Sequence, residues 1–199
     1  VVLTTNPAHT EALGELGAAV VLTTNVDAQQ QAVPLVDAAE AAFNATDPAA
    51  VILAHSVRGR DVASRLAVRK GKALLTDAID VRRDDQGIVT DHENYGGAYT
   101  ATAAATHSAP IITVRIGAID RRADATAPEV HELDVTASGT RAATVTSVTP
   151  VVRTSTRPEL LTADRVVAGG VALGDADMFE QLVGGLADEL GAAVGATRS

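Results

Sequence analysis

Short runs of β-branched residues alternate with helical patterns through the first half of the chain, and this alternation constrains the fold more than any other feature. The runs at residues 1–5, 18–23 and 51–54 are rich in Val, Leu and Thr, and residues 34–45 have the spacing of a helix with one apolar face. Strands that alternate with helices are typical of a parallel sheet flanked by helices. Because residues 51–54 show no apolar–polar alternation, we expect this strand to be buried on both faces.

A polar segment, residues 55–61, follows that predicted buried strand. Asp61 is expected to cap a helix that runs to Arg69 and ends near Gly71. The segment mixes His, Ser, Arg and Asp, which are the residue types of a hydrolytic triad. Residues so close in sequence do not supply a nucleophile, a base and an orienting group from separate elements. Capping and surface roles are therefore favoured over catalysis.

Beyond Asp77, strand-like runs separated by turns replace the helical pattern. We expect these runs to add antiparallel strands to the parallel sheet. They are predicted at residues 78–81, 88–90, 99–105, 111–114 and 129–135, with a hairpin connection at 84–87. One more extended run is predicted at 143–152, and the polar, proline-containing residues 153–160 are the predicted linker. The first domain is then residues 1–152, an α/β domain.

A second βαβ pattern begins after the linker. Residues 165–168 are a predicted strand, Gly169 and Gly170 turn the chain, and residues 176–190 are a predicted helix before another strand at 192–194. The apolar positions of the helix recur at helical spacing. They are Phe179, Leu182, Val183, Leu186 and Leu190. Because the sequence stops as the second strand ends, we expect residues 161–199 to be the truncated beginning of a second doubly wound domain.

The composition argues against several classes of function. The chain has 25 acidic residues against 16 basic ones, a formal net charge of −9, which disfavours binding to the phosphates of nucleic acid. It has no cysteine, and its five histidines show no metal-ligand spacing. No apolar run approaches the ~20 residues of a membrane span. We therefore expect no metal site, no nucleic-acid partner and no insertion into a membrane.

Two short polar segments lie at predicted strand ends in the second domain. Gly169 and Gly170 follow one strand, and Thr197 and Arg198 follow the next. Open α/β sheets bind ligands at the carboxyl ends of their strands, where backbone amides approach a phosphate and an arginine pairs with an anion. A simple tight turn and a solvated arginine are the alternative interpretations. The residues alone thus indicate an α/β domain followed by the start of a nucleotide-type domain.

Longer motifs resemble the alpha subunit of electron transfer flavoproteins. In that family a strand ending in Ser-Gly-Gly-Arg-Gly precedes a helix with Leu-Ala-Asp and then a Gly-Ala-Ser-Arg segment. The residues that carry the resemblance are 163–170, Phe179, 186–188 and 190–198, and earlier in the chain 59–67, 74–77 and 95–97. Two positions depart from the pattern, because Val171 and Ala172 stand where the family has the Arg and Gly that follow Gly-Gly.

The resemblance implies a heterodimeric electron carrier, not an enzyme with its own turnover. FAD would be held mainly by the second domain of this subunit, and a beta subunit would complete the dimer and bind AMP. Electrons would come from acyl-CoA and related dehydrogenases of fatty acid oxidation and pass to a membrane quinone oxidoreductase. The resemblance implies that Thr197 hydrogen-bonds the cofactor and that Arg198 lies against the flavin ring, where a fixed cation stabilises anionic reduced flavin.

The resemblance also implies that later segments carry most of the flavin contacts, so the 199-residue chain by itself is not expected to retain FAD. The scarcity of lysine, with only Lys70 and Lys72, suggests a GC-rich bacterial source and hence the cytoplasm. Two other interpretations are a nucleotide-binding regulatory module of the universal-stress type and a purely structural interaction domain. The first of these requires a phosphate-binding glycine loop after a strand in the first half, and residues 55–58 after the 51–54 strand do not form one.

Overall fold

The computed structural model describes residues 1–85, 87–150 and 155–197. Two compact units divide the chain at Val148, the first being Val1–Val148 and the second Thr149–Ser199. Part of the predicted linker, residues 153–154, lies outside the described residues. None of the helices in the described ranges is both long and apolar enough to span a membrane.

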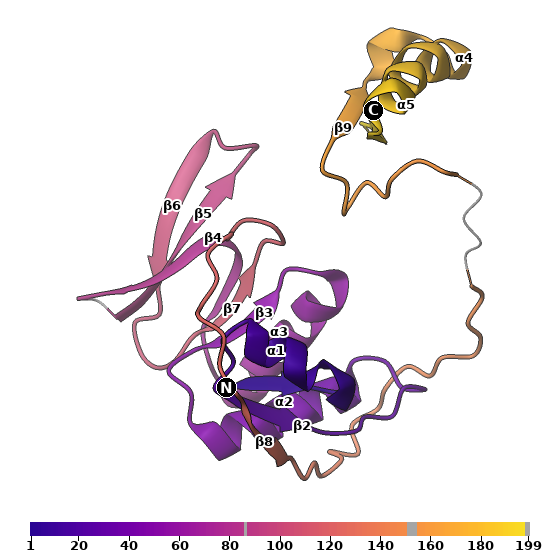
Figure 1. The fold of residues 1–199 in the computed structure, drawn as a ribbon. Helices are drawn as coiled ribbons and strands as arrows, with labels where there is room; N and C mark the ends of the chain where they lie inside the picture. Colours follow the sequence, from indigo (N-terminus) through magenta and orange to yellow (C-terminus); the bar gives the residue numbers. More distant parts are fainter. Residues whose placement is uncertain (86, 151–154, 198–199) are drawn as a thin grey trace. The chain divides into compact units, whose positions relative to one another are not determined.

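The first unit contains two sheets (Figure 1). The smaller sheet has three parallel strands in the order β1-β2-β8, and the larger has five in the order β3-β7-β4-β5-β6. Within the larger sheet β3, β7 and β4 are parallel, whereas β5 and β6 are antiparallel additions. The strands are β1 (Val2–Thr4), β2 (Val20–Thr23), β3 (Val51–Ala54), β4 (Leu74–Asp84), β5 (Gly87–Asn94), β6 (Tyr99–Ala104), β7 (Ile111–Val114) and β8 (Glu129–Glu132).

Helices follow the strands of the first unit, as the alternation predicted. They are a short 3₁₀ turn η1 (Pro7–His9), α1 (Thr10–Glu15), α2 (Val33–Thr46) and α3 (Val57–Lys70). α2 ends where Asp47 takes the left-handed conformation, and α3 ends at Gly71 in the same conformation. The mixed α/β class and the antiparallel additions are thereby confirmed.

The core of the larger sheet lies beneath α3. Leu66 and Ile111 are fully buried there, and the cluster also includes Ala63 and Ala67. Alanine on α3 lets the helix approach the strands closely, so a well-packed core forms with few large side chains. Val51 and Leu53 of β3 and Ala39 of α2 pack against this cluster. α2 and α3 therefore cover the same face of the larger sheet.

The start of α3 differs from the prediction, which placed the cap at Asp61. The helix begins at Val57, and the hydroxyl of Ser56 accepts a hydrogen bond of 3.0 Å from the Gly59 amide. Asp61 lies inside the helix and accepts a hydrogen bond from Arg65, one turn later. A Cβ at position 59 would lie 2.0 Å from the Ala54 carbonyl oxygen, so glycine permits this early start. Residues 55–61 were expected to have capping and surface roles. The capping role is confirmed, but Ser56 fills it and not Asp61.

Four strand predictions also need correction. Residues 111–114 and 129–132 form parallel strands, not antiparallel additions, because β7 pairs with β3 and β4 and β8 pairs with β2. β3 is an edge strand and not buried on both faces, since Ile52 is 57% exposed. In the predicted extended run at 143–152 the described residues make only an isolated bridge, Gln30 with Thr144, and 151–152 lie outside the described residues.

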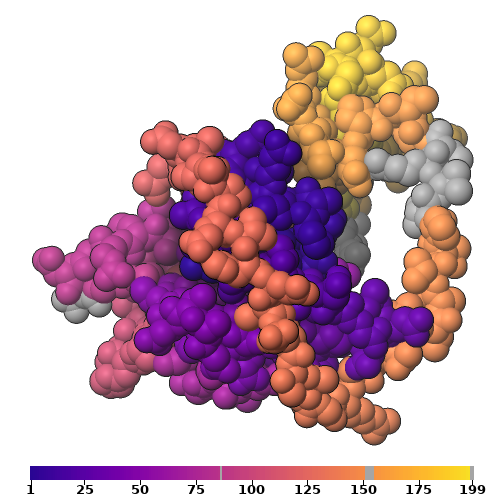
Figure 2. All heavy atoms as spheres, turned by 60° about the horizontal axis from the view of Figure 1, so that its bottom comes forward, coloured from indigo at the N-terminus to yellow at the C-terminus, as the bar shows by residue number. Residues whose placement is uncertain are grey.

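The segment between β7 and β8 lies across α1 (Figure 2). Thr126 donates a backbone hydrogen bond of 2.9 Å to the Gly14 carbonyl, and its hydroxyl donates one of 2.9 Å to the Ala18 carbonyl. A Cβ on Gly14 would meet Pro128 at 2.6 Å, and one on Gly17 would meet Ala123 at 2.5 Å. These two glycines thus let the returning chain reach the position where β8 pairs with β2.

The second unit is a two-stranded parallel sheet with one helical run. Its elements are β9 (Val166–Gly169), the 3₁₀ turn η2 (Val171–Leu173), α4 (Ala176–Phe179), a π-helical turn η3 (Glu180–Gly184), α5 (Gly185–Leu190) and β10 (Ala193–Ala196). The Arg157 guanidinium holds the helical run, because it donates to both Asp188 oxygens at 2.6 and 2.8 Å and also contacts Glu180. The predicted βαβ order of this unit is confirmed.

Candidate functional site

The carboxyl ends of β9 and β10 bring together three of the four predicted site residues. The parallel register pairs Ala196 with Gly169, and the Thr197 amide donates a hydrogen bond of 3.3 Å to the Gly169 carbonyl. Gly170 follows in extended conformation and precedes η2. A Cβ built on Gly170 would lie 3.5 Å from the Thr197 hydroxyl oxygen, with no other atom within 4 Å. The two glycines and Thr197 therefore lie at one strand edge.

The two glycines have different roles there. A Cβ on Gly169 would lie within 2.5–2.8 Å of Leu173, Phe179 and Val183, so glycine at this position lets the helical run pack against β9. Gly170 is exposed and has open space beside Thr197. Gly169 thus serves the packing of the second unit, whereas Gly170 and the exposed Thr197 face solvent at the strand edge.

The fourth predicted residue, Arg198, lies outside the described residues. The assignment of Gly169, Gly170, Thr197 and Arg198 to a cofactor site therefore stays a prediction. Within the described ranges no group of three or more His, Asp or Glu side chains is placed to hold a metal ion.

A second polar constellation lies in the first unit, where the parallel strands β3 and β7 end beside a bulge near the start of β4. His55 follows β3, Thr113 and Arg115 lie at the end of β7, and Asp77 lies at a bulge in β4. The buried Thr113 hydroxyl is 2.8 Å from His55 Nδ1 and accepts a hydrogen bond of 3.1 Å from the Asp77 amide. The ends of β3 and β7 and the bulge near the start of β4 are therefore joined through one threonine.

The Arg115 guanidinium bridges two carboxylates in this constellation. It donates to both Asp77 oxygens at 3.1 and 2.9 Å and to Glu93 at 3.1 Å. Hydrogen bonds from Arg115 lower the pKa of Asp77, although partial burial opposes the shift. Asp77 also has a positive φ of 59°. Because one guanidinium faces two carboxylates, the group ties β7 to β4 and β5 and keeps an excess of negative charge, which disfavours an anionic cofactor.

The sequence analysis did not find Thr113 and Arg115. The available signal was their place at the end of the run 111–114, beside His55 at the end of another run. Carboxyl ends of parallel strands meet at one edge of a sheet. Since the pattern at residues 111–114 predicts an antiparallel addition, the rule does not point to Thr113 and Arg115.

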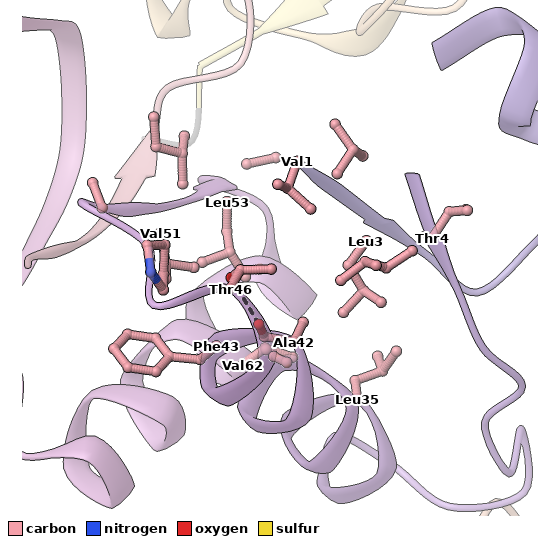
Figure 3. Close-up of a pocket in the computed structure, with 18 of the residues that line it drawn as sticks. Val1, Leu3, Thr4, Leu35, Ala42, Phe43, Thr46, Val51, Leu53 and Val62 are labelled. Carbon is pink, nitrogen blue, oxygen red and sulfur yellow. Dashed lines mark hydrogen bonds between the residues drawn. The ribbon is translucent and has the colours of Figure 1, made fainter. Parts of the chain in front are cut away.

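A groove of about 780 Å³, lined by both apolar and polar side chains, lies in the first unit (Figure 3). Its lining includes Val1, Leu3 of β1, Val51 and Leu53 of β3, and Leu35 of α2. Its polar lining residues include Thr4, Thr46, Ser56 and Arg58.

The first unit matches a known family across most of its length. The profile described as Electron transfer flavoprotein domain matches residues 1–138. This chain belongs to the electron transfer flavoprotein family. The resemblance stated from the motifs is confirmed.

Relatives with the name of the alpha subunit extend the similarity into the second unit. The electron transfer flavoprotein subunit alpha of Mycobacterium leprae is 41% identical over 166 residues, which cover 83% of this chain and 51% of that protein. That of Syntrophomonas wolfei is 39% identical over 160 residues, covering 80% of this chain and 50% of that protein. A probable mitochondrial alpha subunit of Cryptococcus neoformans is 30% identical over 194 residues, covering 96% of this chain and 55% of that protein. The chain thus spans about half the length of the electron transfer flavoproteins that it matches.

Proposed function

We propose that this chain is part of the alpha subunit of a heterodimeric, FAD-containing electron carrier. The observation that carries the proposal is the similarity to alpha subunits over both units, with 41% identity to the Mycobacterium leprae protein and coverage of 96% of this chain by the Cryptococcus neoformans protein. The geometry of the second unit supports it, since its predicted site residues meet at the carboxyl ends of two parallel strands.

The groups at this strand edge fit part of a flavin site. Thr197 offers an exposed hydroxyl, and Gly170 leaves the adjacent backbone open to a close approach. A hydroxyl and an unobstructed backbone are the donors and acceptors that orient the polar edge of a cofactor in a small-molecule site. In this proposal Thr197 and Gly170 hold the cofactor, and Gly169 keeps the strand edge close to the helical run. FAD, when bound, supplies the acceptor for the electrons.

The partners follow from the same proposal. A beta subunit that binds AMP completes the dimer, acyl-CoA and related dehydrogenases of fatty acid oxidation donate electrons, and a membrane quinone oxidoreductase accepts them. Arg198 is proposed to lie against the flavin ring. For a bacterial protein like the relative from Mycobacterium leprae, we place the carrier in the cytoplasm.

The test uses the complete protein co-produced with an electron transfer flavoprotein beta subunit from the same organism. We expect a heterodimer with one flavin absorption band per dimer, which an acyl-CoA dehydrogenase with its substrate bleaches. Thr197→Val should weaken FAD binding by about tenfold, because one hydrogen bond to the cofactor is lost. Thr162→Val, at another exposed threonine of the same unit, is the control and should leave binding unchanged. A heterodimer that binds no flavin would contradict the proposal.

The 199-residue chain alone is a second test. We expect it to purify without flavin, since Gly170 and Thr197 form only one strand edge of the proposed site. A stoichiometric flavin band from these residues alone would show that they form a sufficient site, and the assignment of further contacts to later segments would be wrong.

A further inference from the structure

A π turn interrupts the helical run of the second unit. α4, η3 and α5 follow one another without a break beside β9 (Figure 1), and the π turn is η3, residues Glu180–Gly184. Such a turn holds one residue more than an α-helical turn, is rare and is found mostly at functional sites. Gly184 and Gly185 lie at its end, and glycine has a low helix propensity. The turn therefore depends on contacts from outside the run.

The apolar side chains that pack toward β9 depend on the form of this turn. They lie at every fourth position, with Phe179 before the turn, Val183 in it and Ala187 after it. A Cβ on Gly169 would lie 2.8 Å from Phe179 and from Val183, and both Val183 and Ala187 are buried. On an ideal α-helix, positions four apart drift by about 40° around the axis at each step. The wider turn reduces this drift and keeps the three side chains on one side of the run.

Arg157 bridges the same turn from its polar side. Its Nε and Nη2 donate to the two Asp188 oxygens at 2.6 and 2.8 Å, its Nη1 donates to Glu180 at 3.1 Å, and Nη2 also contacts the other Glu180 oxygen. These hydrogen bonds lower the pKa of both carboxyls, which keeps them charged. Gly184 lies between them, and a Cβ there would come within 2.7–2.8 Å of Glu180 and Arg157. One guanidinium thus ties the first residue of the π turn to a residue of α5.

This bridge fixes the register of the helical run. If η3 relaxed to an ordinary α-helical turn, the residues before it would rotate by roughly 100° relative to those after it, the angle of one residue in an α-helix. Phe179 would then turn away from Gly169 while Ala187 kept its place. Glu180 would rotate with Phe179 and move away from Asp188, so the hydrogen bonds of the guanidinium oppose the change.

The rotation of α4 matters for the strand edge formed by Gly170 and Thr197. The segment between Gly170 and α4 is short and hydrogen-bonded at both ends. The Leu173 amide donates to the Gly170 carbonyl at 3.2 Å, and the Phe179 amide donates to the Asp175 carbonyl at 3.1 Å. A rotated α4 would pull this segment with it and move Gly170 away from Thr197.

We propose that Arg157 is a positioning residue of the proposed flavin site, because its bridge across the π turn keeps Gly170 beside Thr197. The inference rests on the proposed function, since it takes that strand edge as part of the cofactor site. Four of the five N–H groups of the guanidinium already donate to carboxylates, so Arg157 itself does not bind the cofactor. It acts on the site through the register of the helical run.

Flavin binding measures the effect on the site. In the complete protein co-produced with its beta subunit, Arg157→Met should raise the FAD dissociation constant about tenfold, because Gly170 and Thr197 no longer meet the cofactor together. Arg157→Lys keeps a cation over both carboxylates and should restore part of the affinity. Arg141→Met, at an exposed arginine of the first unit, is the control and should leave FAD binding unchanged. An unchanged dissociation constant in Arg157→Met would overturn the proposal.

A double-mutant cycle distinguishes positioning from a general loss of stability. If Arg157 acts through the strand edge, Arg157→Met should weaken FAD binding much less in the Thr197→Val background than in the unsubstituted protein, since the contact that it positions is already lost. Equal weakening in both backgrounds would overturn the proposal.

The register of the run has a probe that needs no flavin. Phe43 and Phe179 are the only phenylalanines of the 199-residue chain, so fluorinated phenylalanine gives two fluorine NMR resonances, with Phe43 as the reference in the first unit. Arg157→Met should shift the Phe179 resonance and leave that of Phe43 in place. A Phe179 resonance that keeps its position, alone or beside that of unfolded chain, would overturn the proposal. A heterodimer of the unsubstituted proteins without flavin would contradict the proposed function itself, whatever the fluorine spectrum shows, so the two failures are told apart.

Discussion

α3 and the helical run 176–190 both follow a parallel strand, yet their apolar faces have different surroundings. α3 lies on the five-stranded sheet, where Leu66 is fully buried and Ala63 is covered with it. The run 176–190 lies on two strands, and only Val183 and Ala187 on its apolar side are fully covered, whereas Leu182 is 54% exposed. An amphipathic sequence thus predicts a helix in both places, but the number of strands beneath the helix decides how much of its apolar face is buried.

The largest expected difference between the two helices comes from shortening one leucine in each. Leu66→Ala should lower the free energy of unfolding of the first unit by about 3–5 kcal/mol, since it leaves a cavity in a closed core. Leu186→Ala should cost less than about 1 kcal/mol, because the side chain is already 52% exposed in the second unit. Hydrogen exchange measured by mass spectrometry gives the free energy of unfolding of each unit separately. Equal costs would mean that Leu186 is covered in solution.

A smaller effect is expected from the buried ion pair that joins α2 to α3. The Asp37 carboxylate, 5% exposed, accepts hydrogen bonds from Arg69 at 2.5 Å and from the Ser138 amide at 3.0 Å. Asp37→Ala should cost about 2–3 kcal/mol, less than a fully buried pair because Arg69 keeps some contact with water. Asp61→Ala, which removes an exposed pair within α3, is the control and should cost about 0.3–0.5 kcal/mol. Urea denaturation followed by circular dichroism measures both.

The same ion pair should make the stability of the first unit depend on pH. Burial alone would raise the pKa of Asp37, but hydrogen bonds from Ser138 and Arg69 outweigh burial and lower it. A lowered folded-state pKa stabilises the fold above the unfolded pKa of about 3.9, and this contribution is lost as the pH falls through the folded value. The cost of Asp37→Asn should therefore be largest near pH 7 and shrink below about pH 4. A cost that is constant down to pH 2 would contradict the assignment.

Effects of comparable or smaller size are expected at two glycines of the second unit. Gly169→Ala should cost about 1–3 kcal/mol, because the new methyl group would overlap Leu173, Phe179 and Val183. Gly185→Ala should stabilise the unit by about 0.5–1 kcal/mol, because Gly185 is helical and its added Cβ would have open space. Faster amide hydrogen exchange of residues 176–190 in Gly169→Ala and slower exchange in Gly185→Ala would support close packing of the helical run on β9. A neutral Gly169→Ala would show that the helical run is free to move away from the strand.

Local signals in the sequence predicted the elements well. The left-handed residue after a helix is the clearest case, since Gly71 and Gly191 end helices where glycine tolerates that conformation. The meeting of Gly169 with Thr197 was also predictable, because a βαβ unit places both strand ends at one edge. The start of α3 shows the limit of local signals, because Ser56 and Asp61 are both good capping residues. The choice between them depends on the approach of Gly59 to Ala54, which is a tertiary contact.

Strand partners were harder to predict than strands. Nothing in the residues 111–114 distinguishes a strand between two parallel neighbours from one in an antiparallel pair. The apolar run 51–54 was expected in the interior, and its position at a sheet edge with Ile52 exposed depends on what lies beside it. The pairing of Arg115 with Asp77 and Glu93 was hard to predict for the same reason, because it depends on the position of β7 between β3 and β4.

The pairing of β2 with β8 has a consequence for the order in which the protein is made. Val20 pairs with Glu129, so the three-stranded sheet closes only after more than one hundred further residues have been synthesised. At a translation rate of ~5–20 residues per second this delay is roughly 5–20 s. During that time β1 and β2 form a two-stranded pair without the returning segment that later covers α1. The larger sheet completes its strands earlier, with β7 at residues 111–114, so β1 and β2 are synthesised before the larger sheet but reach their final pairing after it.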